Sequence, residues 1–180
     1  MRIIGGIYKG RQLLAPRNLP VRPTTDFAKE GLFNILNNHL DFEGLTVLDL
    51  FCGTGNITLE FASRGAKTIV AVDKHTPCLY YVKDTAKALK LGAVHTERGD
   101  VFKYLEKARG NYDLVFADPP YELESIARLH DLVYKGSLLN PGGLLVIEHG
   151  PKTDLSSKEH YLETRKYGNV HFSFFRKAEE

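Results

Sequence analysis

Residues 45–58, L-T-V-L-D-L-F-C-G-T-G-N-I-T, join an apolar run to a glycine-rich loop and the start of a helix. The run is typical of a buried strand, and Gly53 and Gly55 are typical of a tight strand-to-helix turn. Glycine also lets a ligand lie against bare backbone, as dinucleotide sites require. Thr58 stands where the third glycine of that fingerprint is usual. The loop alone therefore fits a ligand site or a simple turn equally well.

Outward from this stretch, strand-like and helix-like segments alternate. Strands are expected at 45–51, 68–73, 94–100, 112–118 and 143–148, and helices at 57–64, 76–91, 102–108 and 123–135. This alternation predicts an α/β fold with a mostly parallel, doubly wound sheet and helices on both faces. Residues 160–176 instead alternate around Gly168-Asn169, which predicts a C-terminal antiparallel β-hairpin.

The pattern divides the chain at about Glu43. Residues 1–42 are predicted to form an N-terminal extension, and residues 43–180 the main domain. In the extension, I-I-G-G-I-Y-K-G-R-Q-L (3–13) predicts a short hairpin, and R-P-T-T-D-F-A-K-E-G-L-F-N-I-L (22–36) predicts a helix that starts at a Thr cap. The apolar face of this helix is either Phe27, Gly31, Ile35 and Leu36 or the offset set Ala28, Leu32 and Ile35.

Length and composition narrow the class of protein. A chain of 180 residues suffices for one domain with a full core and a small extension. Two cysteines, Cys52 and Cys78, do not make a disulfide framework, and the histidines lack the spacing of metal ligands. No run at the start reads as a signal peptide and no later run is long enough to span a membrane, so a cytoplasmic protein is expected.

Charge is unevenly distributed, although the net charge is only +2. The first 25 residues contain no Asp or Glu but five basic residues: Arg2, Lys9, Arg11, Arg17 and Arg22. Such residues are often solvated surface. A basic arm on a nearly neutral domain is also what a protein uses to contact nucleic-acid phosphates, which predicts nucleic-acid binding.

The first four expected strands each carry an acid at or near their end: Asp49, Asp73, Asp100 and Asp118. Ligands of doubly wound sheets bind outside the carboxyl ends of the strands, so we expect these acids at one ligand-binding edge. Asp73 stands where a carboxylate can accept both hydroxyls of a ribose, although a strand-end turn also uses an acid. With the glycine loop, it indicates an adenosine-containing cofactor of unspecified kind.

Residues 115–122, V-F-A-D-P-P-Y-E, run from a strand into an acid, two prolines and a tyrosine. Prolines fix φ and lack an N–H, so Pro119 and Pro120 leave carbonyl acceptors beside the Asp118 carboxylate. An exocyclic amine on a planar base offers two hydrogens to such acceptors and a ring to stack on Tyr121. The stretch therefore favours amine chemistry on a base over hydride transfer.

Together these motifs resemble a known family. D-L-F-C-G-T-G (49–55), Asp73, Asp100 and D-P-P-Y (118–121) are similar to the motifs of Rossmann-like class I S-adenosylmethionine-dependent methyltransferases. With M-R-I-I-G-G-x-Y-K-G-R-x-L (1–13) and R-P-T-T-D-x-x-K-E-G-L-F-N-I-L (22–36), nearly the whole chain resembles the bacterial small-subunit (16S) ribosomal RNA guanine-N2 methyltransferases. It departs from their pattern at Cys52, Thr54, Asn56-Ile57-Thr58 and Asp73, where Glu is more usual.

The resemblance implies that S-adenosyl-L-methionine is the cofactor and guanine in 16S ribosomal RNA the target. The implied cofactor-binding residues are Asp49, Phe51, Gly53, Gly55, Asp73 and Asp100, and the implied catalytic residues are Asp118, Pro119, Pro120 and Tyr121. Arg2, Lys9, Arg11, Arg17 and Arg22 would contact the RNA, in an assembling or assembled subunit, and the enzyme is expected to act as a monomer without a metal. Two alternatives stay open: a DNA adenine-N6 methyltransferase, and a non-catalytic RNA-binding protein with this fold.

Overall fold

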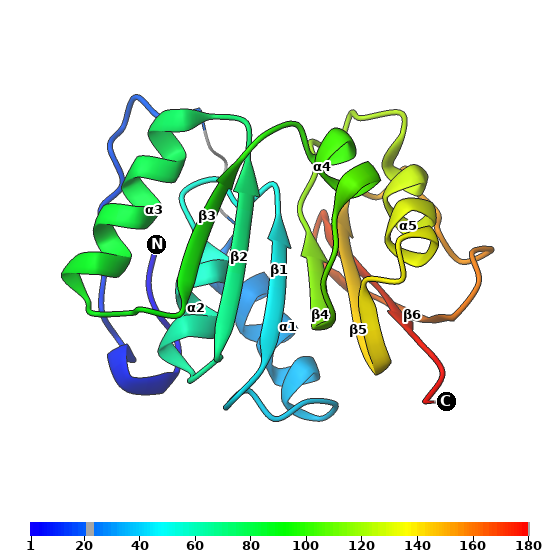
Figure 1. Ribbon diagram of the computed structural model, residues 1–180, viewed down its shortest axis with the longest axis horizontal. Helices are drawn as coiled ribbons and strands as arrows, with labels where there is room; N and C mark the ends of the chain where they lie inside the picture. Colours follow the sequence, from blue (N-terminus) through cyan, green and yellow to red (C-terminus); the bar gives the residue numbers. More distant parts are fainter. Residues whose placement is uncertain (21–23, 180) are drawn as a thin grey trace.

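The computed structural model describes residues 1–20 and 24–179. Its strands form one sheet in the order β3-β2-β1-β4-β5-β7-β6 (Figure 1). They are β1 (Thr46–Leu50), β2 (Thr68–Asp73), β3 (Val94–Arg98), β4 (Tyr112–Ala117), β5 (Leu139–His149), β6 (Tyr161–Tyr167) and β7 (Val170–Arg176). The first five strands pair in parallel, and β7 pairs antiparallel with both β5 and β6. The predicted parallel sheet and C-terminal hairpin are confirmed.

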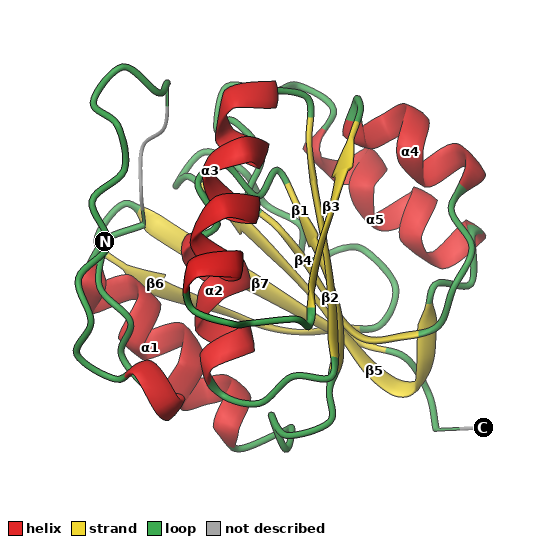
Figure 2. Cartoon of the chain, turned by 60° about the vertical axis from the view of Figure 1, so that its left-hand side comes forward, coloured by secondary structure: helices red, strands yellow, loops and turns green. Residues whose placement is uncertain are grey.

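Helices cover both faces of the sheet (Figure 2). They are α1 (Asp26–Asn37), α2 (Asn56–Ser63), α3 (Thr76–Ala88), α4 (Val101–Lys107) and α5 (Ile126–Lys135). One hydrophobic cluster packs α1, α2 and α3 on alternate strand residues such as Val47, Phe116 and Val146. A second packs α4 and α5 on the intervening residues, such as Leu48 and Val115. Both clusters follow from strands that are apolar on both faces.

The N-terminal extension is less regular than predicted. The hairpin at 3–13 is reduced to one β-bridge, Arg2 with Gln12, around a 3₁₀ turn, η1 (Gly6–Tyr8). The Thr cap of α1 is confirmed, because Thr25 Oγ1 accepts from the Ala28 N–H at 3.2 Å. The offset apolar face is confirmed, because Ala28, Leu32 and Ile35 are all buried. The other set is wrong at Phe27, which is 69% exposed, although its Leu36 is also buried.

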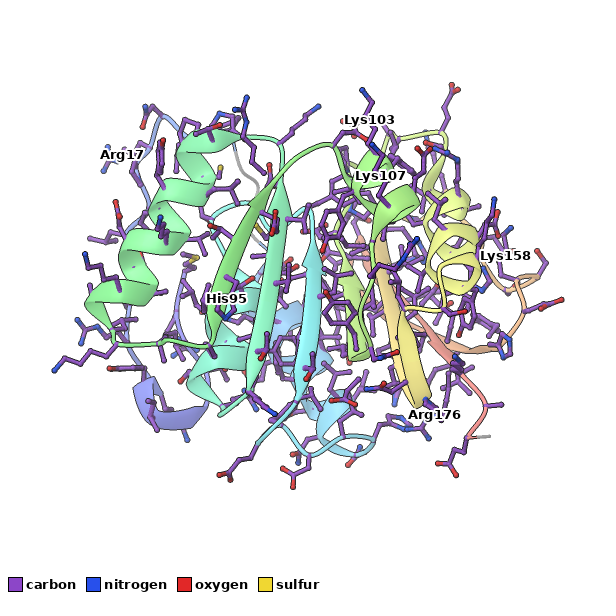
Figure 3. All side chains as sticks on the ribbon, in the orientation of Figure 1. Arg17, His95, Lys103, Lys107, Lys158 and Arg176 are labelled. Atoms are coloured by element: carbon purple, nitrogen blue, oxygen red, sulfur yellow. The ribbon has the colours of Figure 1, made fainter. Side chains whose placement is uncertain are left out.

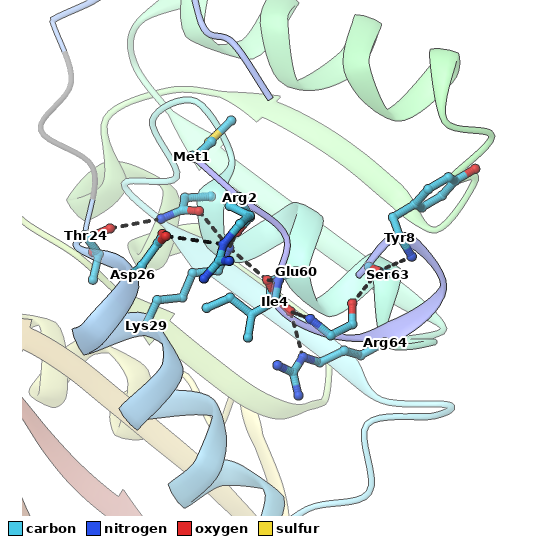
Figure 4. A network of polar contacts seen from close by, with 12 residues as sticks. Met1, Arg2, Ile4, Tyr8, Thr24, Asp26, Lys29, Glu60, Ser63 and Arg64 are labelled. Atoms are coloured by element: carbon cyan, nitrogen blue, oxygen red, sulfur yellow. Dashed lines mark hydrogen bonds and ion pairs between the residues drawn. The ribbon is translucent and has the colours of Figure 1, made fainter. Parts of the chain in front are cut away.

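A buried charge network attaches the extension to α2 (Figure 4). Glu60, on α2, accepts hydrogen bonds from the backbone N–H groups of Ile4 at 2.9 Å and Gly5 at 2.8 Å. It also pairs with Lys29 of α1 and Arg64, each at 2.8 Å. A buried carboxylate is stable only when its oxygens are paired in this way. The extension and main domain therefore share one core, and their division at residue 43 stays a prediction.

Candidate active site

A pocket of about 550 Å³ opens where the strand order reverses, between β1 and β4. It lies at the carboxyl ends of the parallel strands, as expected for a doubly wound sheet, and its volume suits a small-molecule ligand. All four predicted acids line it: Asp49, Asp73, Asp100 and Asp118. The predicted convergence of these side chains is thus confirmed.

The loop after β1 has the backbone that its glycines predict. Gly53 and Gly55 have φ angles of +54° and +84°, in the left-handed region that favours glycine. A Cβ on Gly55 would also lie 2.9 Å from Cγ2 of Val82. Gly53 lines the pocket, whereas Gly55 is not among its lining residues and caps α2 instead. The loop brings bare backbone to the ligand at one glycine and uses the other to start the helix.

Phe51 lines the pocket in an unusual conformation. Its φ of +59° is rare for a residue with a Cβ, and such backbone outliers cluster at functional sites. Its ring packs against Phe102, which also lines the pocket, with ring centroids 6.4 Å apart. The two aromatic side chains form an apolar wall, and Phe102 is a site residue that the sequence analysis did not identify.

Asp73 is fixed at the end of β2 by two backbone donors. Its Oδ2 accepts from the Gly53 N–H and its Oδ1 from the His75 N–H, both at 2.9 Å. A carboxylate oxygen can accept a second hydrogen bond, so both oxygens keep acceptor capacity for a ligand. Asp73 therefore holds the glycine loop and can still bind hydroxyl groups in the pocket.

Asp49 is the most enclosed of the four acids, with 1% of its surface exposed. Thr58 donates its hydroxyl hydrogen to Asp49 Oδ2 at 2.5 Å. The pKa of Asp49 is raised to about 7, chiefly by burial and to a smaller extent by the nearby charges of Asp73 and Glu148, while the hydrogen bond from Thr58 acts in the opposite direction. A cation in the pocket would favour the ionised form of this carboxyl group.

Asp100 and Asp118 are held by local backbone geometry. Asp100 caps α4, because its Oδ1 accepts from the Lys103 N–H at 3.1 Å. The Asp118 N–H donates to the Leu50 carbonyl at 3.2 Å, which ties the residue after β4 to the end of β1. Pro119 and Pro120 line the pocket beside it. Three residues of the predicted D-P-P-Y corner therefore face one cavity.

Tyr121 is placed differently from its three neighbours, since it is not among the lining residues. Its hydroxyl donates to Glu148 Oε2 at 2.8 Å. A Cβ on Gly150 would lie 3.0 Å from Cδ2 of its ring, so the ring packs closely on the chain after β5. Stacking of a base on Tyr121 stays a prediction.

Glu148 and Thr24 are two further residues of this region that were not predicted from the sequence. Glu148 is buried at the end of β5, and its Oε1 accepts from the Thr24 hydroxyl at 2.8 Å. Thr24 lines the pocket. A signal for Glu148 was present, because G-L-L-V-I-E ends in an acid and the first four expected strands carry one at or near their ends. Thr24 had no such signal, since only folding brings the extension to the end of β5.

The predicted RNA-binding residues do not form one cluster. Lys9 and Arg11 follow η1, which is bound to the far end of α2 by the Tyr8 N–H and Ser63 Oγ at 3.0 Å. Arg17 lies toward the end of the molecule at which the pocket opens (Figure 3), and Pro20, three residues later, lines the pocket. Arg2 pairs with Asp26 at 3.4 Å, and Arg22 lies outside the described residues. The basic run is therefore divided between two ends of the molecule.

Within residues 1–20 and 24–179, no group of three or more His, Cys, Asp or Glu side chains is placed to hold a metal ion. The helices in the same ranges are all too short or too polar to cross a membrane.

The chain is similar to known proteins over nearly its whole length. The family model described as "Conserved hypothetical protein 95" matches residues 1–176. The "Putative rRNA methyltransferase YlbH" of Bacillus subtilis is 33% identical, over 98% of this chain and 99% of that protein. The "Ribosomal RNA small subunit methyltransferase D" of Haemophilus influenzae is 26% identical, over 98% of this chain and 93% of that protein. Among solved structures, the "Putative methyltransferase yhhF" of Escherichia coli superposes with a TM-score of 0.86 at 24% identity, over 100% of this chain and 99% of that one.

Proposed function

The chain belongs to the family described as Conserved hypothetical protein 95, and on that premise we propose that it methylates the exocyclic N2 amine of a guanine in small-subunit ribosomal RNA. The methyl donor is S-adenosyl-L-methionine. Curated relatives that align with almost the whole chain are named as ribosomal RNA methyltransferases, one of them for the small subunit. The observation that carries the proposal is the Asp118-Pro119-Pro120 corner, which faces the same pocket as Asp73 and the glycine loop.

The pocket fits the chemistry of this cofactor, which supplies an electrophilic methyl group on a positively charged sulfonium. Asp73 would accept hydrogen bonds from the ribose hydroxyls, with the backbone at Gly53 close beside it. Asp49 would provide negative charge for the cationic part. Phe51 and Phe102 supply an apolar wall for the adenine ring. Asp100, the N-cap of α4, lines the same pocket.

The target amine is a poor nucleophile because its lone pair is delocalised into the guanine ring. In the proposed mechanism, the Asp118 carboxylate and the Pro119 carbonyl accept its two hydrogens, which leaves the nitrogen lone pair directed at the methyl group. Holding the reactants in line can supply about 7–11 kcal/mol in favourable cases. A carboxylate is too weak a base to remove an amine proton before attack, so Asp118 orients the amine first and receives or relays a proton late.

We further propose that the enzyme works in the cytoplasm as a monomer, on an assembling or assembled small subunit. The sulfonium methyl group is already electrophilic, so the reaction needs no metal. Arg17, which lies toward the pocket end of the molecule, would contact RNA phosphates near the target.

The test is transfer of tritiated methyl groups to three substrates: undermethylated small subunits, naked small-subunit RNA and duplex DNA. We expect label in the RNA, recovered as N2-methylguanosine after digestion to nucleosides. Label in DNA as N6-methyladenine would favour the adenine methyltransferase that shares the D-P-P-Y motif. RNA binding without transfer to any substrate would favour a non-catalytic protein. The Asp118→Ala variant is the negative control.

A further inference from the structure

Glu148 occupies a position beside the target-base corner that the proposed mechanism does not use. In the parallel pairing of β4 and β5, Ala117 lies opposite Ile147, so Asp118 and Glu148 are the next residues at the same level of neighbouring strands. Glu148 also shares a strand face with Val146, whose cluster includes Phe116. It is 3% exposed. The acid near the end of β5, the last of the parallel strands, is therefore buried directly next to the corner.

Each oxygen of the Glu148 carboxylate has a different partner. Oε2 accepts from the Tyr121 hydroxyl and Oε1 from the Thr24 hydroxyl, both at 2.8 Å. Tyr121 belongs to the corner after β4, whereas Thr24 belongs to the extension and lines the pocket just before α1. A single side chain thus joins two segments that are 97 residues apart and that meet at the pocket.

The link continues toward the cofactor loop. The Thr24 carbonyl accepts from Asn56 Nδ2 at 3.5 Å, and Asn56 Oδ1 accepts from Lys29 Nζ at 2.8 Å (Figure 4). Asn56 begins α2, immediately after Gly55, and lines the pocket. The base corner, the extension and the start of α2 are therefore connected through side-chain hydrogen bonds that centre on Thr24 and Glu148.

Burial makes this arrangement costly unless both oxygens stay bonded. An unpaired buried carboxylate loses its hydration without compensation, whereas hydrogen bonds to an ionised group are among the stronger ones in proteins. The Tyr121 ring is fixed at its other side by close packing on Gly150. With its hydroxyl held by Glu148, the Tyr121 ring is restrained at both ends, and this restrains the adjoining turn that contains Pro119 and Pro120.

We propose that Glu148 is a positioning residue for methyl transfer. Its carboxylate holds the Tyr121 ring and the D-P-P-Y corner in the orientation that receives the target base, and it couples the corner to the extension through Thr24. This inference rests on the proposed role of the corner in binding the target amine. It predicts that breaking the link slows methyl transfer from bound reactants and leaves the cofactor pocket itself intact.

The experiment is a double-mutant cycle on the Tyr121–Glu148 hydrogen bond. Single-turnover methyl transfer is measured for wild type, Glu148→Gln, Tyr121→Phe and the double variant, at saturating cofactor and RNA. Each single variant should be about 10- to 100-fold slower, because small misplacements of reacting groups have effects of that size. The double variant should be no slower than the slower single variant, since both changes break the same bond. Cofactor affinity by calorimetry should stay within about twofold of wild type if only the corner is misplaced.

Asp113→Asn is the matched control. Asp113, at the start of β4, also accepts one hydrogen bond on each oxygen, from the Thr46 N–H at 3.0 Å and from Asn140 Nδ2 at 2.9 Å. It lies at the amino end of the parallel strands, opposite the pocket. We expect wild-type transfer rates from this variant. If Glu148→Gln does not fold, Tyr121→Phe alone tests the Tyr121–Glu148 bond. Thr24→Val then tests the hydrogen bond to the other Glu148 oxygen, Oε1.

The possible outcomes separate the inference from the proposed function. Wild-type rates in Glu148→Gln and Tyr121→Phe, or losses that multiply in the double variant, would overturn the positioning role while the methyltransferase function stands. An equal slowing by Asp113→Asn would also overturn it, because the effect would then reflect loss of any structural carboxylate. A wild-type protein that methylates no RNA would contradict the proposed function and the inference together.

Discussion

Asp73 Oδ2 accepts a hydrogen bond from the backbone N–H of Gly53 at 2.9 Å, so the acid that ends β2 holds the glycine loop that follows β1. The two strands are neighbours, and Val72 lies opposite Leu50 in their parallel pairing. Each segment thus fixes the other at the edge where the cofactor is proposed to bind. A ribose bound to Asp73 would lie beside the bare backbone of the loop.

Removal of the Asp73 carboxylate should therefore weaken cofactor binding. We expect Asp73→Ala to lower the affinity for S-adenosylmethionine by about 1.5–3 kcal/mol, the usual scale for hydrogen bonds to a charged group. Asp73→Asn should lose less, because its amide oxygen can still accept. Isothermal titration calorimetry measures the affinities, with Asp84→Ala, an exposed acid on α3, as the control. A folded Asp73→Ala protein with wild-type affinity would refute the ribose role.

Asp49 predicts a pH dependence of cofactor binding. Its pKa is raised to about 7, chiefly by burial, so the folded protein retains a proton that the unfolded chain releases. The resulting contribution to stability is present at low pH and is lost as the pH rises through 7. A bound cation stabilises the ionised form and lowers the pKa. Cofactor affinity should therefore rise between about pH 5.5 and 7 and be accompanied by proton release.

Calorimetry in buffers of different ionisation enthalpy measures that proton release directly. The Asp49→Asn variant cannot release the proton, so its affinity should be lower and nearly independent of pH across the same range. The same pH slope in the variant and in wild type would assign the titration to another group.

The sheet and the four acids could be predicted because their determinants are local. Apolar runs that end in an acid and are followed by Gly or Pro define β1 and β4, and Thr25 marks the start of α1. Glu148 follows the same rule at the end of β5, but its role depends on Tyr121 and Thr24, which only the folded chain brings to it.

The position of the basic extension was not predictable for a related reason. Charges that are adjacent in sequence do not specify which end of the domain they reach. Here the path is set by long-range contacts: the Ile4 and Gly5 N–H groups bind Glu60, and the Tyr8 N–H binds Ser63. These contacts carry Lys9 and Arg11 along α2, away from the pocket.

Arg17 and Arg11 should therefore differ in their effect on RNA binding. Arg17 lies toward the pocket end of the molecule, whereas the Arg11 guanidinium lies 5.9 Å from the centre of the Tyr8 ring at the other end. We expect Arg17→Ala to weaken RNA binding and to reduce the slope of affinity against salt concentration by the amount of about one phosphate contact. Arg11→Ala should change the affinity and the slope less. Filter binding over a range of salt concentrations measures both slopes. Equal slopes in the two variants would mean that position along the sheet does not determine RNA contact.

Asp118 offers the most direct test of how the amine is activated. If its carboxylate acts as a hydrogen-bond acceptor, Asp118→Asn should keep partial activity, because the amide oxygen still accepts, whereas Asp118→Ala should be nearly inactive. If it acts as an obligatory base, both variants should be equally inactive. The Asp118 N–H donates to the Leu50 carbonyl at the end of β1, so a substitution here could disturb the loop after β1. Cofactor affinity is therefore measured for each variant. Single-turnover transfer on one RNA substrate then gives the comparison. Equal loss in the Asn and Ala variants, with cofactor binding intact, would replace the positioning mechanism by one in which Asp118 removes the proton as the methyl group is transferred.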